Sequence, residues 1–135
     1  MKTENQIIAG KRKTAVAKLR MKPGTGIIYF NYLPHTELNL FHRLALLEPL
    51  KIYEQELGKL QFDFIIKARG GGAEAQIEAA RLAIAKALVH ATASDTLKKA
   101  FLAYDRNMIV PDARRKEASK PGDSAPRAKR QKSYR

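Results

Sequence analysis

The chain of 135 residues contains no cysteine, which excludes disulfide bonds, thiolate metal sites and a cysteine nucleophile. No apolar run approaches the roughly 20 residues that cross a bilayer, and Met1 to Gln6 are polar, unlike the start of a signal peptide. A chain of this length corresponds to one domain with a modest core. These absences predict an intracellular protein without a membrane partner.

Acidic residues are scarce at both ends of the chain. Residues 1–22 hold seven Lys or Arg and one acid, and residues 111–135 hold nine and three, so each end carries +6. Of the formal net charge of +13, the remaining +1 belongs to the middle of the chain. Like charges destabilise a compact state, so this arrangement indicates binding to a polyanion, above all a nucleic acid.

The last part of the chain lacks the residues from which a core is built. From Asp112 to Arg135 there is no Leu, Ile, Val, Phe or Met. Such a segment does not bury apolar surface of its own, and we expect it to be extended or disordered until it meets a partner. The sequence therefore predicts a globular domain over residues 1–110 and an extended basic tail over residues 111–135.

Two segments near the start of the domain have the pattern of strands. Ala15 to Met21 alternates apolar residues with Lys18 and Arg20, and Lys22 continues the row of cations. A strand of this kind packs one face on a core and presents the cations on the other. Ile27 to Tyr32 is rich in β-branched and aromatic residues, so we expect a hairpin between these two segments, with Gln6 to Ala9 as a further strand.

The middle of the chain predicts helices around one further strand. Helical spacing with Thr36 as N-cap and Pro49 as terminator predicts the first helix, and a short piece from Lys51 to Leu57 follows. The next predicted element is a strand from Leu60 to Arg69, which the triple glycine at 70–72 ends. A helix follows the triple glycine and runs to about His90, and a further helix is capped by Ser94 or Asp95 and runs to about Tyr104. This order predicts an α+β fold around one mixed sheet.

The triple glycine Gly70-Gly71-Gly72 precedes a predicted helix and could hold an anion at the helix N-terminus. The lysine and hydroxyl residues of a phosphate-binding P-loop are missing, however, and Ala73-Glu74-Ala75 follows instead. We therefore favour a tight strand-to-helix turn, with backbone contact to RNA phosphate as an additional role. A nucleotide-dependent phosphotransferase remains the enzymatic alternative.

Other polar clusters point away from catalysis. His35, His42 and His90 lack the spacing of metal ligands, and no serine has the context of a nucleophile, so no metal, cofactor or small-molecule substrate is expected. Glu74, Glu78 and Arg81 share one helical stripe, which indicates solvated ion pairing rather than a catalytic dyad.

The final residues, Arg127 to Arg135, interleave cations with a glutamine, a serine and one aromatic ring. Arginine forks bind phosphate oxygens in pairs, and Tyr134 could stack on an unpaired base. A generic solubilising tail is the simpler alternative, but a second basic block at Lys11 to Lys13 favours two surfaces that wrap a large folded polyanion.

Three segments together resemble the family of the ninth small-subunit ribosomal protein. They are Gly10 to Gly24, similar to that family's N-terminal hairpin, Arg69 to Leu88, similar to its glycine-rich signature, and Arg130 to Arg135, which looks like the archaeal and eukaryotic terminus. The resemblance covers essentially the whole chain. One departure is the stretch from Lys120 to Arg127, which is less glycine-rich and more acidic than the archaeal pattern.

The resemblance implies a mixed four-stranded sheet packed with helices, like domain 2 of ribosomal protein S5, and a structural, non-enzymatic role in the cytoplasmic ribosome. It implies binding to ribosomal RNA (rRNA) in the head of the small subunit, beside neighbouring head proteins, and a tail that reaches the transfer RNA (tRNA) in the peptidyl site. The implied rRNA contacts are Lys11, Arg12, Lys13, Lys18, Arg20, Lys22, Arg69, Gly70, Gly71, Gly72, Arg114, Arg115, Lys116, Arg127, Lys129 and Arg130, and the implied tRNA contacts are Lys132, Tyr134 and Arg135.

A rival interpretation is a general nucleic-acid-binding protein of chromatin type, whose tail is a nonspecific arm. Comparable affinity for duplex DNA and rRNA would favour that reading.

Overall fold

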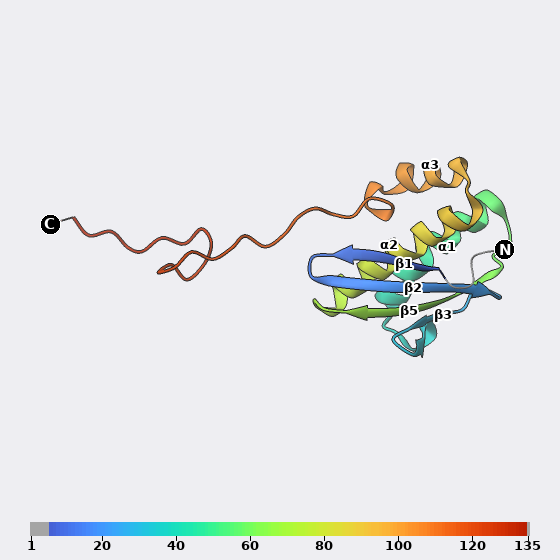
Figure 1. Cartoon of the computed structure of the whole chain (residues 1–135), viewed down its shortest axis with the longest axis horizontal. Coiled ribbons are helices and arrows are strands. Elements are labelled where there is room, and N and C mark those ends of the chain that lie inside the picture. Colours follow the sequence, from blue (N-terminus) through green and yellow to red (C-terminus); the bar gives the residue numbers. More distant parts are fainter. Residues whose placement is uncertain (1–5, 135) are drawn as a thin grey trace.

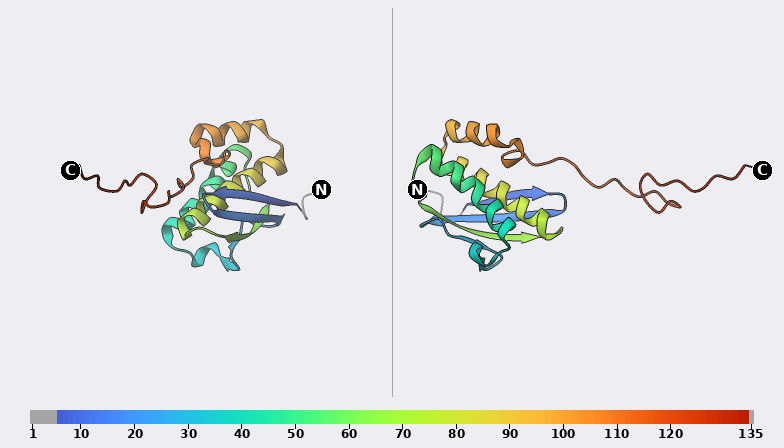
Figure 2. Two further views of the ribbon diagram at one scale, coloured as in Figure 1. Left: turned by 60° about the vertical axis from the view of Figure 1, so that its left-hand side comes forward. Right: turned by 180° about the vertical axis from the view of Figure 1, so that it is seen from behind.

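The computed structural model describes residues 6–134, and its body is a mixed sheet with helices on one face (Figures 1 and 2). In chain order the elements are β1 (Ile7–Arg12), β2 (Ala15–Pro23), β3 (Ile28–Phe30), β4 (Leu33–Pro34), the 3₁₀ helix η1 (His35–Glu37), α1 (Leu40–Leu57), β5 (Phe62–Arg69), α2 (Ala73–Thr92), α3 (Asp95–Tyr104) and the 3₁₀ helix η2 (Arg106–Met108). The predicted α+β class is confirmed. The sheet has five strands rather than the expected four, because the two-residue strand β4 extends its edge.

The hairpin predicted between residues 15–21 and residues 27–32 is wrong. The strand order is β1-β2-β5-β3-β4, so β5 lies between β2 and β3, antiparallel to the first and parallel to the second. The hairpin partner of β2 is β1 instead. Asp63 on β5 accepts hydrogen bonds from the backbone N–H groups of Thr25, Gly26 and Ile27 at 2.8–2.9 Å, and this holds the segment after β2 as a crossover over the end of β5.

The boundaries predicted for the first helix are also wrong. Helix α1 begins after Asn39, whose side chain accepts a hydrogen bond from the N–H of Phe41, and not after Thr36. Pro49 lies inside the helix, where it is buried in the core, and the segment after it continues the same helix to Gly58. Burial of the proline ring offsets the loss of one backbone hydrogen bond.

The predictions for the last two helices are confirmed. Helix α2 starts after Gly72, and α3 starts after Ser94, whose hydroxyl accepts a hydrogen bond from the N–H of Leu97 at 3.3 Å. Helix α2 is central: it packs on β1, β2 and β5 and also contacts α1. A Cβ at Gly10 on β1 would lie 2.1 Å from the carbonyl oxygen of Ala79, so the missing side chain sets how closely the helix approaches the sheet.

Among residues 6–134 no helix covers the opposite face of the sheet (Figures 1 and 2). The strands β2 and β5 alternate buried and more exposed residues, as predicted. After Pro111 the chain has no regular secondary structure in its described part and leads away from the body (Figure 1). Among the described residues no helix is long and apolar enough to cross a membrane.

Candidate nucleic-acid interface

The open face of the sheet is basic. Lys18, Arg20 and Lys22 on β2 are exposed, while Ala17, Leu19 and Met21 between them are buried, as the alternating pattern predicts. The strand pairing adds cations from the neighbouring strand. The residues of β5 that stand opposite Val16 and Lys18 are Arg69 and Lys67. We call this surface, formed by β1, β2, β5 and the residues that flank them on that face, the basic sheet face.

Lys67 was not among the contacts predicted from the sequence. The alternation of β5 places it with Arg69 on the polar side of the strand, which was a usable signal. The position of β5 in the sheet was also needed, because only the pairing with β2 brings Lys67 next to Lys18. Because the predicted strand order paired β2 with the wrong segment, Lys67 was not recognised as a cation of this face.

The basic block Lys11 to Lys13 divides between two roles. Lys11 and Lys13 are exposed, and Lys13 lies in the β1–β2 turn with a positive φ of 52°. The side chain of Arg12, in contrast, is 16% exposed. Its Nε lies 2.6 Å from a carboxylate oxygen of Glu78 on α2, and its guanidinium also contacts Asp112 at the start of the tail. Arg12 therefore joins three parts of the chain.

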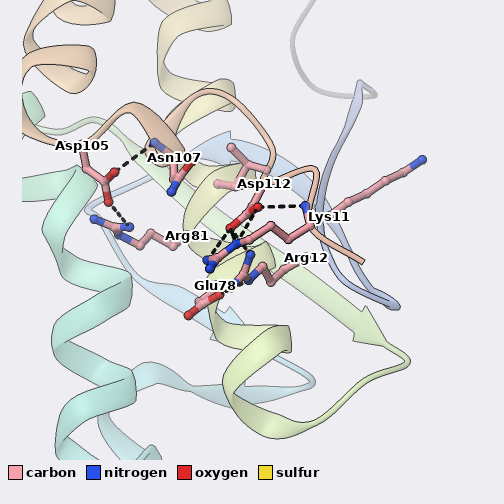
Figure 3. Close-up of a pocket in the computed structure, with 9 residues that line it drawn as sticks. Lys11, Arg12, Glu78, Arg81, Asp105, Asn107 and Asp112 are labelled. Carbon is pink, nitrogen blue, oxygen red and sulfur yellow. Dashed lines mark hydrogen bonds and ion pairs between the residues drawn. The ribbon is translucent and has the colours of Figure 1, made fainter. Parts of the chain in front are cut away.

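Asp112 is the meeting point of this network (Figure 3). It also accepts hydrogen bonds from the Arg114 side chain at 2.8–3.2 Å and from the Arg114 backbone N–H at 2.9 Å. These bonds from Arg114, with a smaller contribution from Arg12, hold the pKa of Asp112 well below its ordinary value. We call Arg12, Glu78, Asp112 and Arg114 the tail clamp, because together they fasten the root of the tail to the body.

A second ion network lies beside the tail clamp (Figure 3). Arg81 on α2 contacts Glu48 of α1 at 2.6 Å and Asp105 at 3.1 Å. Glu74 contacts His42 of α1 at 2.7 Å. The expected pairing of Glu74, Glu78 and Arg81 along their own helix is therefore wrong. Each of the three pairs with another element because that face of α2 lies against α1, β1 and the segment after α3.

The triple glycine forms a tight turn, as favoured from the sequence. Gly70 and Gly71 have positive φ values of 76° and 62°, which glycine adopts without strain. A Cβ on Gly70 would lie 2.5 Å from the carbonyl oxygen of Thr14, so the loop packs against the β1–β2 turn. Gln76 also donates a hydrogen bond to the Gly70 carbonyl at 3.1 Å. Nothing lies within 4 Å of the Cβ position of Gly72, where the surface is open.

The tail holds few contacts with itself. Arg127 donates two hydrogen bonds to Glu117 at 2.7 and 3.0 Å, and Arg130 donates one to the Gly122 carbonyl at 2.8 Å. These contacts close the loop of the tail visible in Figure 1. The side chains of the other candidate contacts in the tail are exposed: Arg114, Arg115, Lys116, Lys129, Lys132 and Tyr134. Arg135 lies outside the described residues.

The structure shows no cluster typical of a metal site in residues 6–134. No three His, Asp or Glu side chains in that range come together as metal ligands do. Instead, the fold defines a class: an α+β domain with one open basic face and a basic extension.

Comparison with known proteins gives the family. Residues 10–135 match the model of the family described as ribosomal protein S9/S16. The chain is 43% identical over 129 residues to small ribosomal subunit protein uS9 of Methanococcus maripaludis strain C7. The matched region covers 93% of this chain and 95% of the relative. It is 42% identical, with the same coverage, to the protein of that name from Methanococcus vannielii. The chain belongs to the ribosomal protein S9/S16 family.

Family membership confirms several predictions. The chain is a structural component of the small subunit of the cytoplasmic ribosome rather than an enzyme, which rules against the phosphotransferase alternative. The archaeal type inferred from the C-terminal residues fits the Methanococcus relatives.

Proposed function

We propose that this protein binds rRNA in the head of the small subunit through two separate surfaces, the basic sheet face and the tail. The observation that carries the proposal is the one-sided charge of the sheet. Its exposed cations are Lys11, Lys18, Arg20, Lys22, Lys67 and Arg69. The acid described on this face, Asp63, has its carboxylate engaged by three backbone N–H groups. A rigid array of this kind suits the regularly spaced phosphates of folded RNA.

The end of the sheet at the triple glycine extends this surface. Arg69, the open backbone at Gly72 and the exposed Lys13 in the neighbouring turn lie around the same edge. Without side chains, the glycine backbone lets a phosphate approach the N–H groups that begin α2. We assign this edge to phosphate contact rather than to the reading of bases.

The tail supplies the second surface. Arg114, Arg115, Lys116, Arg127, Lys129 and Arg130 would contact rRNA, and Lys132, Tyr134 and Arg135 at the end would contact tRNA in the peptidyl site. The proposal is supported by the lack of apolar residues after Asp112, which leaves the tail without a core to bury and therefore available to a partner. Neighbouring proteins of the subunit head would complete its surroundings.

The salt dependence of rRNA binding tests the two surfaces separately. Neutralisation of one phosphate by each of the nine tail cations would contribute roughly −6 to −8 to the slope of log K against log salt concentration. Replacement of residues 113–135 by a neutral segment of the same length should remove that part of the slope and leave the part due to the sheet face. An unchanged slope would refute the role of the tail.

The matched variant for the sheet is Lys18→Gln with Arg20→Gln and Lys67→Gln, which should reduce the slope by about 2 to 3. For the tRNA contact, subunits that carry a chain ending at Gln131 should bind peptidyl-site tRNA more weakly while they retain the protein through a high-salt wash. Equal tRNA occupancy would exclude a role for the last residues, and loss of the full chain in the wash would exclude the rRNA proposal itself.

A further inference from the structure

The basic sheet face contains a hollow that phosphate binding does not explain. It has a volume of about 330 Å³, and the residues that line it are Ile7, Lys18, Leu19, Arg20, Tyr32, Ile65 and Lys67. The volume far exceeds the roughly 30 Å³ that a water molecule occupies in the liquid. Ile7 on β1 and Ile65 on β5 give the hollow apolar surface, and Arg20 on β2 lies opposite both of them in the strand pairing. A purely electrostatic surface does not need apolar residues in its lining.

Tyr32 stands beside this hollow with 80% of its surface exposed. The Nζ atom of Lys67 lies 5.1 Å from the centre of its ring, within the range of a cation–π contact. The ammonium covers one part of the ring, and the high exposure shows that the remainder is open. An exposed aromatic ring among cations is the arrangement on which proteins stack unpaired bases.

The backbone at Tyr32 is strained, because its conformation is one that glycine adopts easily and a bulky residue does not. Asn31 and Tyr32 form the two-residue loop between β3 and β4, and both have positive φ, 49° and 71°. A loop of this type prefers Asn-Gly, and a bulky residue at the second position carries a steric cost. Asn31 anchors the loop to β5 through hydrogen bonds with Ile66 and Ala68, both 2.9 Å. The fold therefore holds an aromatic side chain at a position where glycine would carry less strain. This points to a function for the ring.

We propose that the Tyr32 hollow binds one unstacked base of a single-stranded rRNA segment, while Lys18, Arg20 and Lys67 hold the phosphates on either side. The cations that line the hollow select a polyanion, and its apolar residues together with the ring select a base. The inference rests on the rRNA binding proposed above and adds a contact of a different chemical kind. It explains why an exposed isoleucine, Ile7, and an exposed tyrosine, Tyr32, lie next to the cations of this face.

The test uses the full chain and a short oligouridylate as probe, with an RNA duplex of equal length for comparison. Tyr32→Gly removes the ring and relieves the positive φ, so the thermal midpoint should stay the same or rise. Affinity for the oligouridylate should fall about 5- to 100-fold. The salt slope should not change, because no cation has been removed. Duplex binding should be unaffected.

Two variants serve as controls. Tyr32→Phe keeps the ring and should bind within about twofold of the original chain, because stacking does not need the hydroxyl. Tyr104→Leu removes a ring of 59% exposure from α3, away from the sheet face, and should also bind within about twofold. If Tyr32→Gly binds oligouridylate as well as the original chain, or if Tyr104→Leu loses as much affinity, the proposal is refuted.

The outcomes separate this inference from the proposed function. If the chain binds rRNA with the expected salt slope but does not bind oligouridylate, the proposed base-binding site is wrong and the rRNA proposal stands. If it binds neither, both fail. In assembled small subunits, a p-benzoylphenylalanine at position 32 should crosslink to rRNA on irradiation. A crosslink to a neighbouring protein would overturn the proposal and identify the hollow as a protein contact.

Discussion

Arg12 at the end of β1 and Asp112 at the root of the tail are 100 residues apart in sequence, yet their side chains share a hydrogen bond. Glu78 of α2 contacts the same guanidinium at 2.6 Å. The contact gives the tail a defined starting point on the body, beside the β1–β2 turn and its exposed lysines. The two basic ends of the chain therefore meet at one acidic residue, and the tail departs from the hairpin rather than from an unrelated part of the surface.

Substitution Asp112→Asn should loosen the root of the tail. The neutral amide no longer attracts the two guanidinium groups, so trypsin should cut after Arg114 and Arg115 several-fold faster, with the body still folded. Asp123→Asn, in the same tail but outside the tail clamp, is the matched control and should not change the cleavage rate. Equal rates for both variants would show that the clamp does not restrain the tail.

Gly10→Ala should destabilise the body by about 1–3 kcal/mol or more, as overpacking of a close contact does. The new Cβ would lie 2.1 Å from the Ala79 carbonyl oxygen and 2.8 Å from the Ala83 nitrogen, so β1 and α2 would have to separate. Ala9→Ser, on the exposed side of the same strand, should change the free energy of unfolding by less than about 0.5 kcal/mol. Urea unfolding of both variants measures the difference, and similar values would contradict the close packing.

Asp63→Ala should cost about 1–2 kcal/mol, because three backbone N–H groups lose their acceptor. Burial raises the pKa of Asp63, but the hydrogen bonds from Ile27, Thr25 and Gly26 together lower it below its ordinary value of 3.8. A lowered pKa in the folded state means that the charged carboxylate adds stability above pH 3.8, and that this stability disappears as the pH falls through the folded-state pKa.

The difference in stability between the original chain and Asp63→Asn should therefore be largest near neutral pH and shrink in acid. Unfolding in urea at a series of pH values measures it. A difference that grows as the pH falls would contradict the lowered pKa.

Arg81→Leu should destabilise the contact between α1 and α2 by about 1–3 kcal/mol, because Glu48 and Asp105 would face each other without their shared cation. The double variant with Glu48→Gln should recover part of the loss, since one uncompensated charge is removed. Arg106→Leu, an exposed neighbour, is the control and should be close to neutral. Additive effects of Arg81→Leu and Glu48→Gln would show that the two residues do not interact.

Local patterns predicted a large part of the fold. The alternation along β2, the glycines before α2 and the start of α3 at Ser94 or Asp95 each depend on residues near one another in sequence. All three were confirmed, and the structure identifies Ser94 as the cap. The hairpin expected between β2 and β3 failed because strand neighbours in a sheet depend on contacts between distant segments. Pro49 was taken as a helix end because its burial inside α1 is not visible in the local sequence.

The candidate site was predicted to a similar extent. The cations of β2 and the exposed residues of the tail lie as expected, since alternation and the absence of apolar residues place them on the surface. Arg12 was expected to face rRNA, and the structure shows it paired with Glu78 and Asp112. Its neighbours Lys11 and Lys13 carry the same charge but are exposed, and the contacts of Arg12 with α2 and the tail come from segments far away in the sequence.

The sequence by itself determined that both ends of this protein are basic and that its last residues have no core to bury, because charge and apolar content are properties of composition. It also determined which face of β2 carries cations, because side chains alternate along a strand. Only the tertiary structure decided that β5 lies between β2 and β3, which brings Lys67 beside Lys18 and Tyr32 beside Lys67. Those neighbours come from strand pairing between segments far apart in the chain, and no local pattern records it.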